Sequence, residues 1–177
     1  MIRPSAVAWG VMLLSASTGF AQYPEAFRSV PLSRAPIPTE AQPAVRRYRP
    51  VEIQGGLFDA AAAVSFEKAK SPRRVQLNLF DNVSHRAVLD KVEYVKASKT
   101  TLVWTGRLEL MKRGHVTLAV TGKYVSGTVI TDDGVIYQIR PAQAAVHWIQ
   151  EMDFAQLPPE AMPVVVDTPG NPAAAEE

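Results

Sequence analysis

The sequence predicts a small, mainly β domain whose strands follow one another as an antiparallel meander and form a sandwich or a partly closed barrel. Three observations carry this prediction. Apolar and polar residues alternate in a series of short segments, proline is concentrated near the two ends of the chain, and one stretch alone has a helical pattern.

Proline marks the predicted boundaries of the folded domain. Residues 22–50 contain six prolines and residues 158–177 contain five, whereas residues 51–157 contain only Pro72 and Pro141. Proline has no backbone N–H and a fixed φ. We therefore expect a proline-rich linker over 22–50, one β domain over 51–157 and a disordered tail over 158–177.

One segment, Leu57–Lys70, has the period of an amphipathic helix. Its apolar face consists of residues at helical spacing: Phe58, Ala62, Phe66 and Ala69. Asp59 is placed to cap the N-terminus, and Pro72 follows the C-terminus. The domain is therefore expected to carry one short helix near its N-terminal end.

Alternating segments fill the rest of the domain. Seven of them are expected to be strands: Val75–Leu79, Arg86–Val95, Leu102–Leu110, Val116–Val120, Tyr124–Thr131, Val135–Ile139 and Ala145–Glu151. Val51–Gln54 is a further candidate for an edge strand, and Asp132-Asp133-Gly134 has the composition of a hairpin turn. Short connections between consecutive strands favour antiparallel pairing.

Residues 1–21 are expected to be a secretion signal. Arg3 precedes a short apolar run, Ala6–Leu14, and Gly19-Phe20-Ala21 supplies small residues before a cleavage point. Cleavage after Ala21 predicts a secreted or periplasmic protein. The apolar run is shorter than the ~20 residues of a membrane span, so a single-span anchor is the less favoured alternative. The chain has no cysteine, so disulfide bonds do not contribute to its stability.

The charge pattern argues against nucleic-acid binding. The net charge is +2, and residues 51–157 carry thirteen bases and eleven acids. The two signs are intermixed along the strands, whereas nucleic-acid binding requires Lys and Arg clustered on one face.

No pattern of catalytic or metal-binding residues is found. The three histidines, His85, His115 and His147, lie on separate segments, and no HExxH pair is present, so a site in which the three converge is the less favoured alternative. Ser84 and His85 lie close to Asp81, but neighbours on a strand point to opposite faces and cannot form a nucleophile and its base. The sequence therefore predicts no catalytic residue, no metal site and no cofactor. Asp132-Asp133-Gly134 is interpreted as a turn and not as a calcium site.

The tryptophans raise the alternative of carbohydrate binding on an exposed aromatic row. Trp104 lies on the apolar face of its segment and is expected in the core, and the position of Trp148 is left open. Asn82-Val83-Ser84 matches a glycosylation sequon by pattern only.

From Val75 onward, four segments occur in a characteristic order: VQLNLFDNVSHRAVLDKVE, WTGRLEL, GHVTLAVTGKYVSGTVITDDGVIYQI and HWIQEMDFAQLPPE. This order resembles the N-terminal propeptide region of bacterial secreted zinc metalloproteases of the reprolysin-like and peptidyl-Asp metzincin types. The resemblance covers Val75–Pro159, and the catalytic motif of that family, HExxHxxGxxH, does not follow. It therefore implies a propeptide-like domain without its enzyme.

The resemblance implies a non-catalytic protein that binds a secreted zinc metalloprotease and inhibits it or assists its folding. Four acidic residues in the flanking segments are candidates for a zinc-directed latch: Glu25, Glu40, Glu160 and Asp167. The motif residues have structural interpretations. Asn78 is expected at a strand-to-turn transition, Gly106 and Gly127 at close backbone approaches, and Pro158-Pro159 at the end of the last strand. The alternative function is an extracellular or envelope binding module for an unknown polymer or protein.

Overall fold

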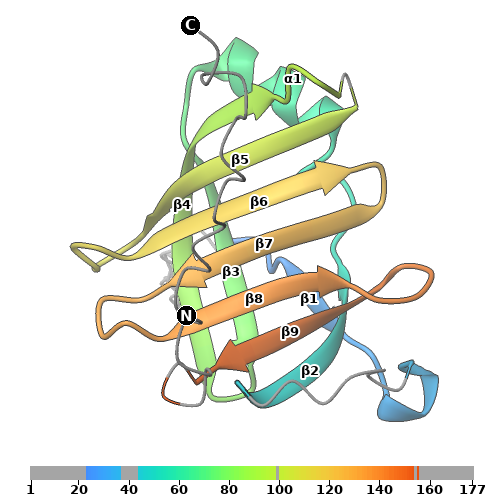
Figure 1. Ribbon diagram of the computed structural model, residues 1–177. Coiled ribbons are helices and arrows are strands. Elements are labelled where there is room, and N and C mark those ends of the chain that lie inside the picture. The colour runs from blue at the N-terminus through green and yellow to red at the C-terminus, as the bar shows by residue number, and fades with distance from the viewer. Residues whose placement is uncertain (1–22, 37–43, 99, 154, 156–177) are drawn as a thin grey trace, which may run out of the picture.

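The structure is a computed structural model that describes residues 23–36, 44–98, 100–153 and 155 (Figure 1). Nine antiparallel strands form one sheet that curves into a nearly closed barrel, and one α-helix packs at an end of it. The elements are β1 (Phe27–Ser29), a 3-10 turn (Leu32–Arg34), β2 (Val45–Ile53), α1 (Ala60–Ala69), β3 (Arg73–Phe80), β4 (Val83–Tyr94), β5 (Thr101–Leu108), β6 (His115–Thr121), β7 (Tyr124–Ile130), β8 (Ile136–Pro141) and β9 (Val146–Met152). The prediction of a mainly β, antiparallel fold with one short helix is confirmed.

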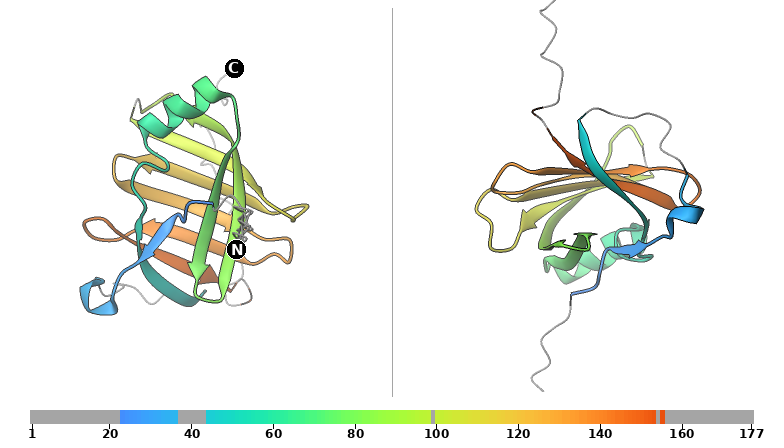
Figure 2. Two further views of the ribbon diagram at one scale, coloured as in Figure 1. Left: turned by 180° about the vertical axis from the view of Figure 1, so that it is seen from behind. Right: turned by 90° about the horizontal axis from the view of Figure 1, so that it is seen from below.

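The strand order is β1-β2-β9-β8-β7-β6-β5-β4-β3. Strands β3 to β9 form the expected meander, in which each strand pairs with the next one along the chain. β2 pairs with β9, and β1 pairs with the other edge of β2. Figure 2 shows the sheet bending back on itself, and β1 comes to lie beside β3.

The inside of the barrel is the hydrophobic core. The alternation predicted from the sequence places one face of each meander strand there, and the large side chains that are fully buried include Trp104, Leu77, Leu89, Leu118, Ile139 and Ile149. The Trp104 indole N–H donates to the Phe58 carbonyl oxygen at 2.8 Å, and its ring meets Phe66 edge-on at 5.5 Å between centroids. The prediction that Trp104 belongs to the core is confirmed.

Helix α1 covers one end of the barrel. The Asp59 carboxylate accepts from the Ala62 N–H at 2.8 Å, as the cap prediction requires, and Lys70 ends the helix in the left-handed conformation with φ 50°. Ala62 is buried and Phe66 is half-buried against the core. The expectation that Ala69 shares this buried face is wrong, because only the earlier turns pack on the barrel and Ala69 is exposed. No helix of the described residues is long and apolar enough to cross a membrane.

The prediction of a linker over 22–50, with the domain beginning at residue 51, is wrong. Strand β1 and most of β2 lie inside that range. Pro50 is tolerated within β2 because it lies opposite the end of β1, where the pairing does not require an N–H donor from it. Its carbonyl accepts from the Val30 N–H at 3.2 Å. Arg47 and Arg49 occupy inward positions of β2 that a hydrophobic pattern cannot reveal. The predicted signal, residues 1–21, and the predicted tail, residues 158–177, lie outside the described residues.

Two glycines allow close contact between strands, as expected. A Cβ atom on Gly106 would lie 2.2 Å from the Val88 carbonyl oxygen, and one on Gly127 would lie 2.6 Å from the Thr117 carbonyl oxygen. Both distances are shorter than atomic contact allows, so neither position accommodates a side chain without movement of the neighbouring backbone.

Candidate functional site

The barrel is closed between β1 and β3 partly by backbone and partly by a side chain. Near the α1 end, the Gln76 N–H donates to the Pro24 carbonyl at 2.9 Å and the Ala26 N–H donates to the Gln76 carbonyl at 2.8 Å. One step further, the Asn78 amide takes the place of a peptide group. Its Oδ1 accepts from the Phe27 N–H at 3.1 Å, and its Nδ2 donates to the Phe27 carbonyl at 2.7 Å. Asn78 therefore fastens β1 to β3; it lies within β3 and not at the strand-to-turn transition expected from the sequence.

Beyond Ser29 the closure ends, because β1 stops while β2 extends to its start at Val45 and β3 leads into the turn at Asp81 and Asn82. This leaves a groove of about 350 Å³ between the two strands, at the end of the barrel away from α1. We call this groove the seam; it is lined by Ser29, Val30, Leu32, Arg47, Tyr48, Arg49, Pro50, Phe80, Asp81 and Asn82. A strand that continued the line of β1 would occupy it.

Two arginines of β2 reach across the seam to β3. The Arg49 guanidinium donates to the Asn78 carbonyl at 2.7 Å, to the Leu79 carbonyl at 3.1 Å and to the Ser29 hydroxyl. Arg47 donates to the Asn82 side-chain oxygen at 2.9 Å. Both arginines share the inward face of β2 with Val51, so their side chains form the floor of the seam.

Positive charge is in excess around the seam. Arg46 and Arg47 both pair with the buried Glu151 carboxylate, at 3.4 and 2.7 Å. Arg49 is bonded to neutral oxygen atoms only, and it has no carboxylate partner in the part of the chain that the structure describes. The further acid of the seam, Asp81, is exposed.

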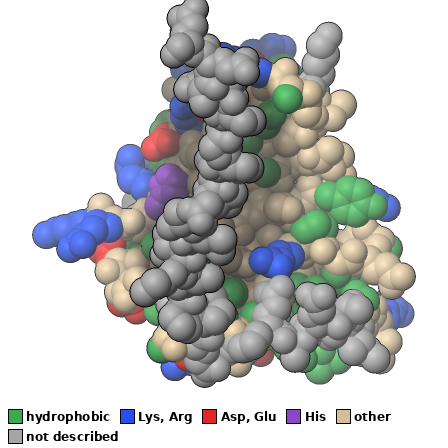
Figure 3. All heavy atoms as spheres, in the orientation of Figure 1, with side chains coloured by type: hydrophobic (Ala, Val, Ile, Leu, Met, Phe, Trp, Pro, Cys, Tyr) green, Lys and Arg blue, Asp and Glu red, His purple; other side chains and the backbone are tan. Residues whose placement is uncertain are grey.

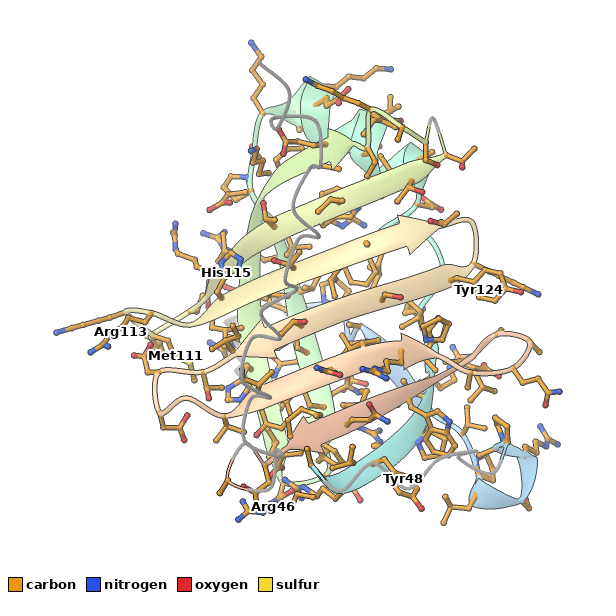
Figure 4. All side chains as sticks on the ribbon, in the orientation of Figure 1. Arg46, Tyr48, Met111, Arg113, His115 and Tyr124 are labelled. Atoms are coloured by element: carbon orange, nitrogen blue, oxygen red, sulfur yellow. The ribbon has the colours of Figure 1, made fainter. Side chains whose placement is uncertain are left out.

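The outer edge of β2 presents unpaired backbone groups to the seam. Pro50 and Gln54 bond to β1, so the even-numbered residues of β2 direct their backbone groups toward this side. Tyr48 comes next in that series, beyond the end of β1, and no described strand pairs with it on this side; Arg46 follows at an irregularity in the pairing with β9. Figure 4 shows both side chains at the rim of the molecule, and Tyr48 is 50% exposed. An unpaired strand edge of this kind is a template for strand addition.

The three histidines do not come together. His115 lies exposed at the start of β6, where its Nε2 is 3.0 Å from the Thr117 hydroxyl (Figure 4). His147 is fully buried on the inward face of β9, where Nε2 accepts from the Val125 N–H and Nδ1 faces the Ala145 carbonyl, each at 3.0 Å. Nδ1 therefore carries the proton and the ring is neutral, and burial lowers the pKa of His147. No group of three metal-ligating side chains occurs among the described residues.

His85 lines a second groove at the same end of the barrel, of about 360 Å³, with Tyr137 and Asp133. Burial lowers the pKa of His85, and the Asp133 carboxylate opposes that effect. The neighbouring Ser84 hydroxyl instead bonds to the Gln76 side chain at 2.5 Å. The alternating faces of β4 thus keep the Ser84 hydroxyl and the His85 ring apart.

The segment Asp132-Asp133-Gly134 forms the turn between β7 and β8, as expected. Gly134 has φ 83°, a conformation that favours glycine. The Asp132 carboxylate accepts from the backbone N–H groups of Lys112 and Arg113, at 2.8 and 2.6 Å, and these bonds lower its pKa. Asp132 therefore ties two neighbouring loops together.

The outer face of β6 to β8 carries a shallow groove of about 580 Å³. The side chains that line this groove are mostly small and uncharged, and Figure 3 shows mainly uncharged polar groups and backbone on this face. Arg140 is the charged residue among those lining it. Trp148 is 8% exposed and meets Tyr48 edge-on at 5.2 Å, so neither Trp104 nor Trp148 belongs to an exposed aromatic row.

The remaining sequence candidates are dispersed. Asn82 of the sequon lies in the seam and accepts from Arg47. Glu25, one of the four latch candidates, lies 3.4 Å from the Asn78 amide nitrogen. Glu40, Glu160 and Asp167 lie outside the described residues, as do Pro158 and Pro159. Sequence reasoning missed the arginines of the seam; the RRYR run at residues 46–49, inside a proline-rich segment, was the available signal.

Comparison with known proteins shows little similarity. No protein-family model and no curated protein sequence matches the chain. A solved structure described as "Structure of a chaperone-substrate complex" superposes with a TM-score of 0.48 and 14% sequence identity, covering 78% of this chain and 94% of that one.

Proposed function

We propose that the protein is a non-catalytic, exported binding protein whose partner is a secreted zinc metalloprotease, which it inhibits or helps to fold. The observation that carries the proposal is the seam, where an unpaired strand edge lies over a basic floor. Proteins that recognise extended segments commonly do so by adding a strand to such an edge. The choice of a metalloprotease as the partner rests on the resemblance of Val75–Pro159 to metzincin propeptides.

The proposal assigns no reaction to the chain. Ser84 bonds to Gln76 while His85 faces the groove beside Tyr137, so these two side chains do not supply a nucleophile and its base. Glu151, a buried acid near the seam, is neutralised by two arginines and supports the fold.

An extracellular or envelope binding module for a polymer is the second candidate. The observation that favours it is the groove on the outer face of β6 to β8, whose hydroxyl groups come from Thr117, Ser126 and Thr128. Such a surface offers hydrogen-bonding groups to a polar polymer but lacks the exposed aromatic rings that stack on sugars.

Titration of the mature chain, from Gln22 onward, into an assay of a secreted zinc metalloprotease from the same organism tests the proposal. We expect a stoichiometric loss of peptidase activity, or a higher yield of active protease when the denatured protease is refolded with the protein present. The protein alone, with and without added zinc, is the control for intrinsic activity. If no complex forms at micromolar concentrations in calorimetry and neither readout changes, the proposal is wrong.

A further inference from the structure

We propose that the seam binds an extended peptide segment as an added strand, antiparallel to β2, and that it selects segments with acidic side chains. This inference deepens the proposed function and rests on it only in taking the partner to be a protein. It assigns the binding site to β2 and defines the chemistry of the segment that fits there.

The position of the added strand follows from the line of β1. β1 runs antiparallel to β2, and Glu25 just before it is bridged in parallel to Gln76 of β3, so this segment fills the space between β2 and β3 down to Ser29. An added strand in the same line would pair with the outward backbone groups of Tyr48, the next even-numbered residue of β2. It would form main-chain bonds similar to those between β1 and residues 51–53.

The floor of the seam determines which side chains fit inward. Arg47 and Arg49 lie on the inward face of β2, and Arg49 has no carboxylate partner among the described residues. Arg47 shares Glu151 with Arg46, so the three arginines face two acids, Glu151 and the exposed Asp81. Carboxylates on the inward positions of the added strand would be stabilised by charge-assisted bonds to this floor.

The rim determines which side chains fit outward. Tyr48 is 50% exposed and Leu32 is 72% exposed, and both belong to the seam. Because side chains of a strand alternate between two faces, a segment with acidic residues inward and aliphatic residues outward matches both the floor and the rim.

Two blocked heptapeptides test this preference: Thr-Val-Glu-Val-Glu-Val-Thr and its counterpart with lysine in place of glutamate. Binding to the isotopically labelled mature chain is followed by NMR chemical-shift changes up to millimolar peptide. We expect the acidic peptide to bind, with shifts concentrated at residues 46–50, and the lysine peptide to bind at least about tenfold more weakly. Equal affinities, a preference for lysine, or no binding of either peptide would overturn the inference.

Three variants locate the site. Arg49→Gln should weaken acidic-peptide binding about tenfold or more. Tyr48→Pro should abolish it, because proline removes the N–H that pairs with the added strand, whereas Tyr48→Ala retains that N–H and should bind more tightly than Tyr48→Pro. Tyr124→Ala and Arg107→Gln change an exposed tyrosine and an exposed arginine outside the seam and should bind normally. Circular dichroism identifies any variant that does not fold, and normal binding by folded Arg49→Gln contradicts the inference.

Two outcomes separate this inference from the proposed function. Acidic-peptide binding at the seam without any metalloprotease complex leaves the inference standing and contradicts the proposed partner. Inhibition of the protease that is unchanged in Tyr48→Pro and Arg49→Gln supports the proposed function and contradicts the inference. Sedimentation of the protein alone tests a second copy as the occupant, and a dimer lost in Tyr48→Pro would overturn the peptide assignment.

Discussion

Replacing Asn78 with aspartate tests whether one side-chain amide holds the barrel closed. The substitution changes almost no volume but converts the Nδ2 donor into an oxygen. That oxygen would face the Phe27 carbonyl across a distance that is 2.7 Å for the present hydrogen bond. The other oxygen can still accept from the Phe27 N–H. Glu25, 3.4 Å from the same nitrogen, adds a like charge.

The expected loss of stability follows from these contacts. One hydrogen bond is lost and a partly buried carbonyl is left without its donor, which costs about 1–3 kcal/mol. For a domain of this size the melting temperature falls by about 4 °C for each kcal/mol. The repulsion raises the pKa of the new carboxyl, and protonation restores a donor toward Phe27. The difference in unfolding free energy between the variant and the unmodified protein should therefore shrink as the pH falls toward about 4.

Thermal and urea unfolding of the variant, followed by circular dichroism between pH 4 and pH 8, measure this effect. The matched control is Asn82→Asp, the same chemical change at a site where Arg47 already donates at 2.9 Å. The new charge of the control meets a cation, so its stability should be unchanged or slightly higher. Equal stability of the two variants at pH 7 would refute the reasoning.

Three further changes address the core and its pH dependence. Trp104→Ala should cost about 3–5 kcal/mol in urea unfolding, because it empties a fully buried site and leaves the Phe58 carbonyl without its donor. Gly106→Ala should cost about 1–3 kcal/mol or prevent folding, since its Cβ would lie 2.2 Å from the Val88 carbonyl oxygen, whereas alanine at the exposed, unobstructed Gly55 should cost far less. Burial lowers the pKa of His147, so the unfolded chain takes up the proton first and stability should fall as the pH drops below about 6.5, by up to about 1.4 kcal/mol per pH unit. In urea titrations from pH 5 to pH 8, His147→Gln should show a shallower decline; an unchanged slope would count against a neutral buried ring.

The meander and the helix were accessible from the sequence because each has a clear period. The segments from Val75 onward alternate every second residue, and Asp59 marks the start of α1 where its carboxylate accepts from the Ala62 N–H. β1 and the part of β2 before Val51 were not accessible, because six prolines dominate the composition of residues 22–50. In β2 the inward positions carry the polar heads of Arg47 and Arg49, so the expected apolar alternation is absent.

The seam was not predictable from the sequence, because it results from where one strand stops. Nothing local to Ser29 indicates that β1 stops there while β2 extends further. The side chains that bond to backbone groups in place of a neighbouring strand were equally unpredictable from the sequence. Asn78 bonds to Phe27, and His147 bonds to the Val125 N–H. Each of these contacts joins segments that are distant in sequence. An asparagine or a histidine in a sequence does not by itself indicate that its side chain will bond to the backbone of a distant strand.

The pairing of β2 with β9 has a consequence for the order in which the protein folds. Arg46 and Glu151, whose side chains join these strands, are 105 residues apart in sequence. Contacts between such distant residues form late, because the entropy of closing the loop between them must first be overcome. The meander can assemble from neighbouring hairpins, but β2 has only the short strand β1 as a sheet partner until β9 is in the sheet. A chain that is interrupted before β9 would therefore display neither the strand edge nor the arginine floor, so a partner that binds there would discriminate completed molecules from unfinished ones.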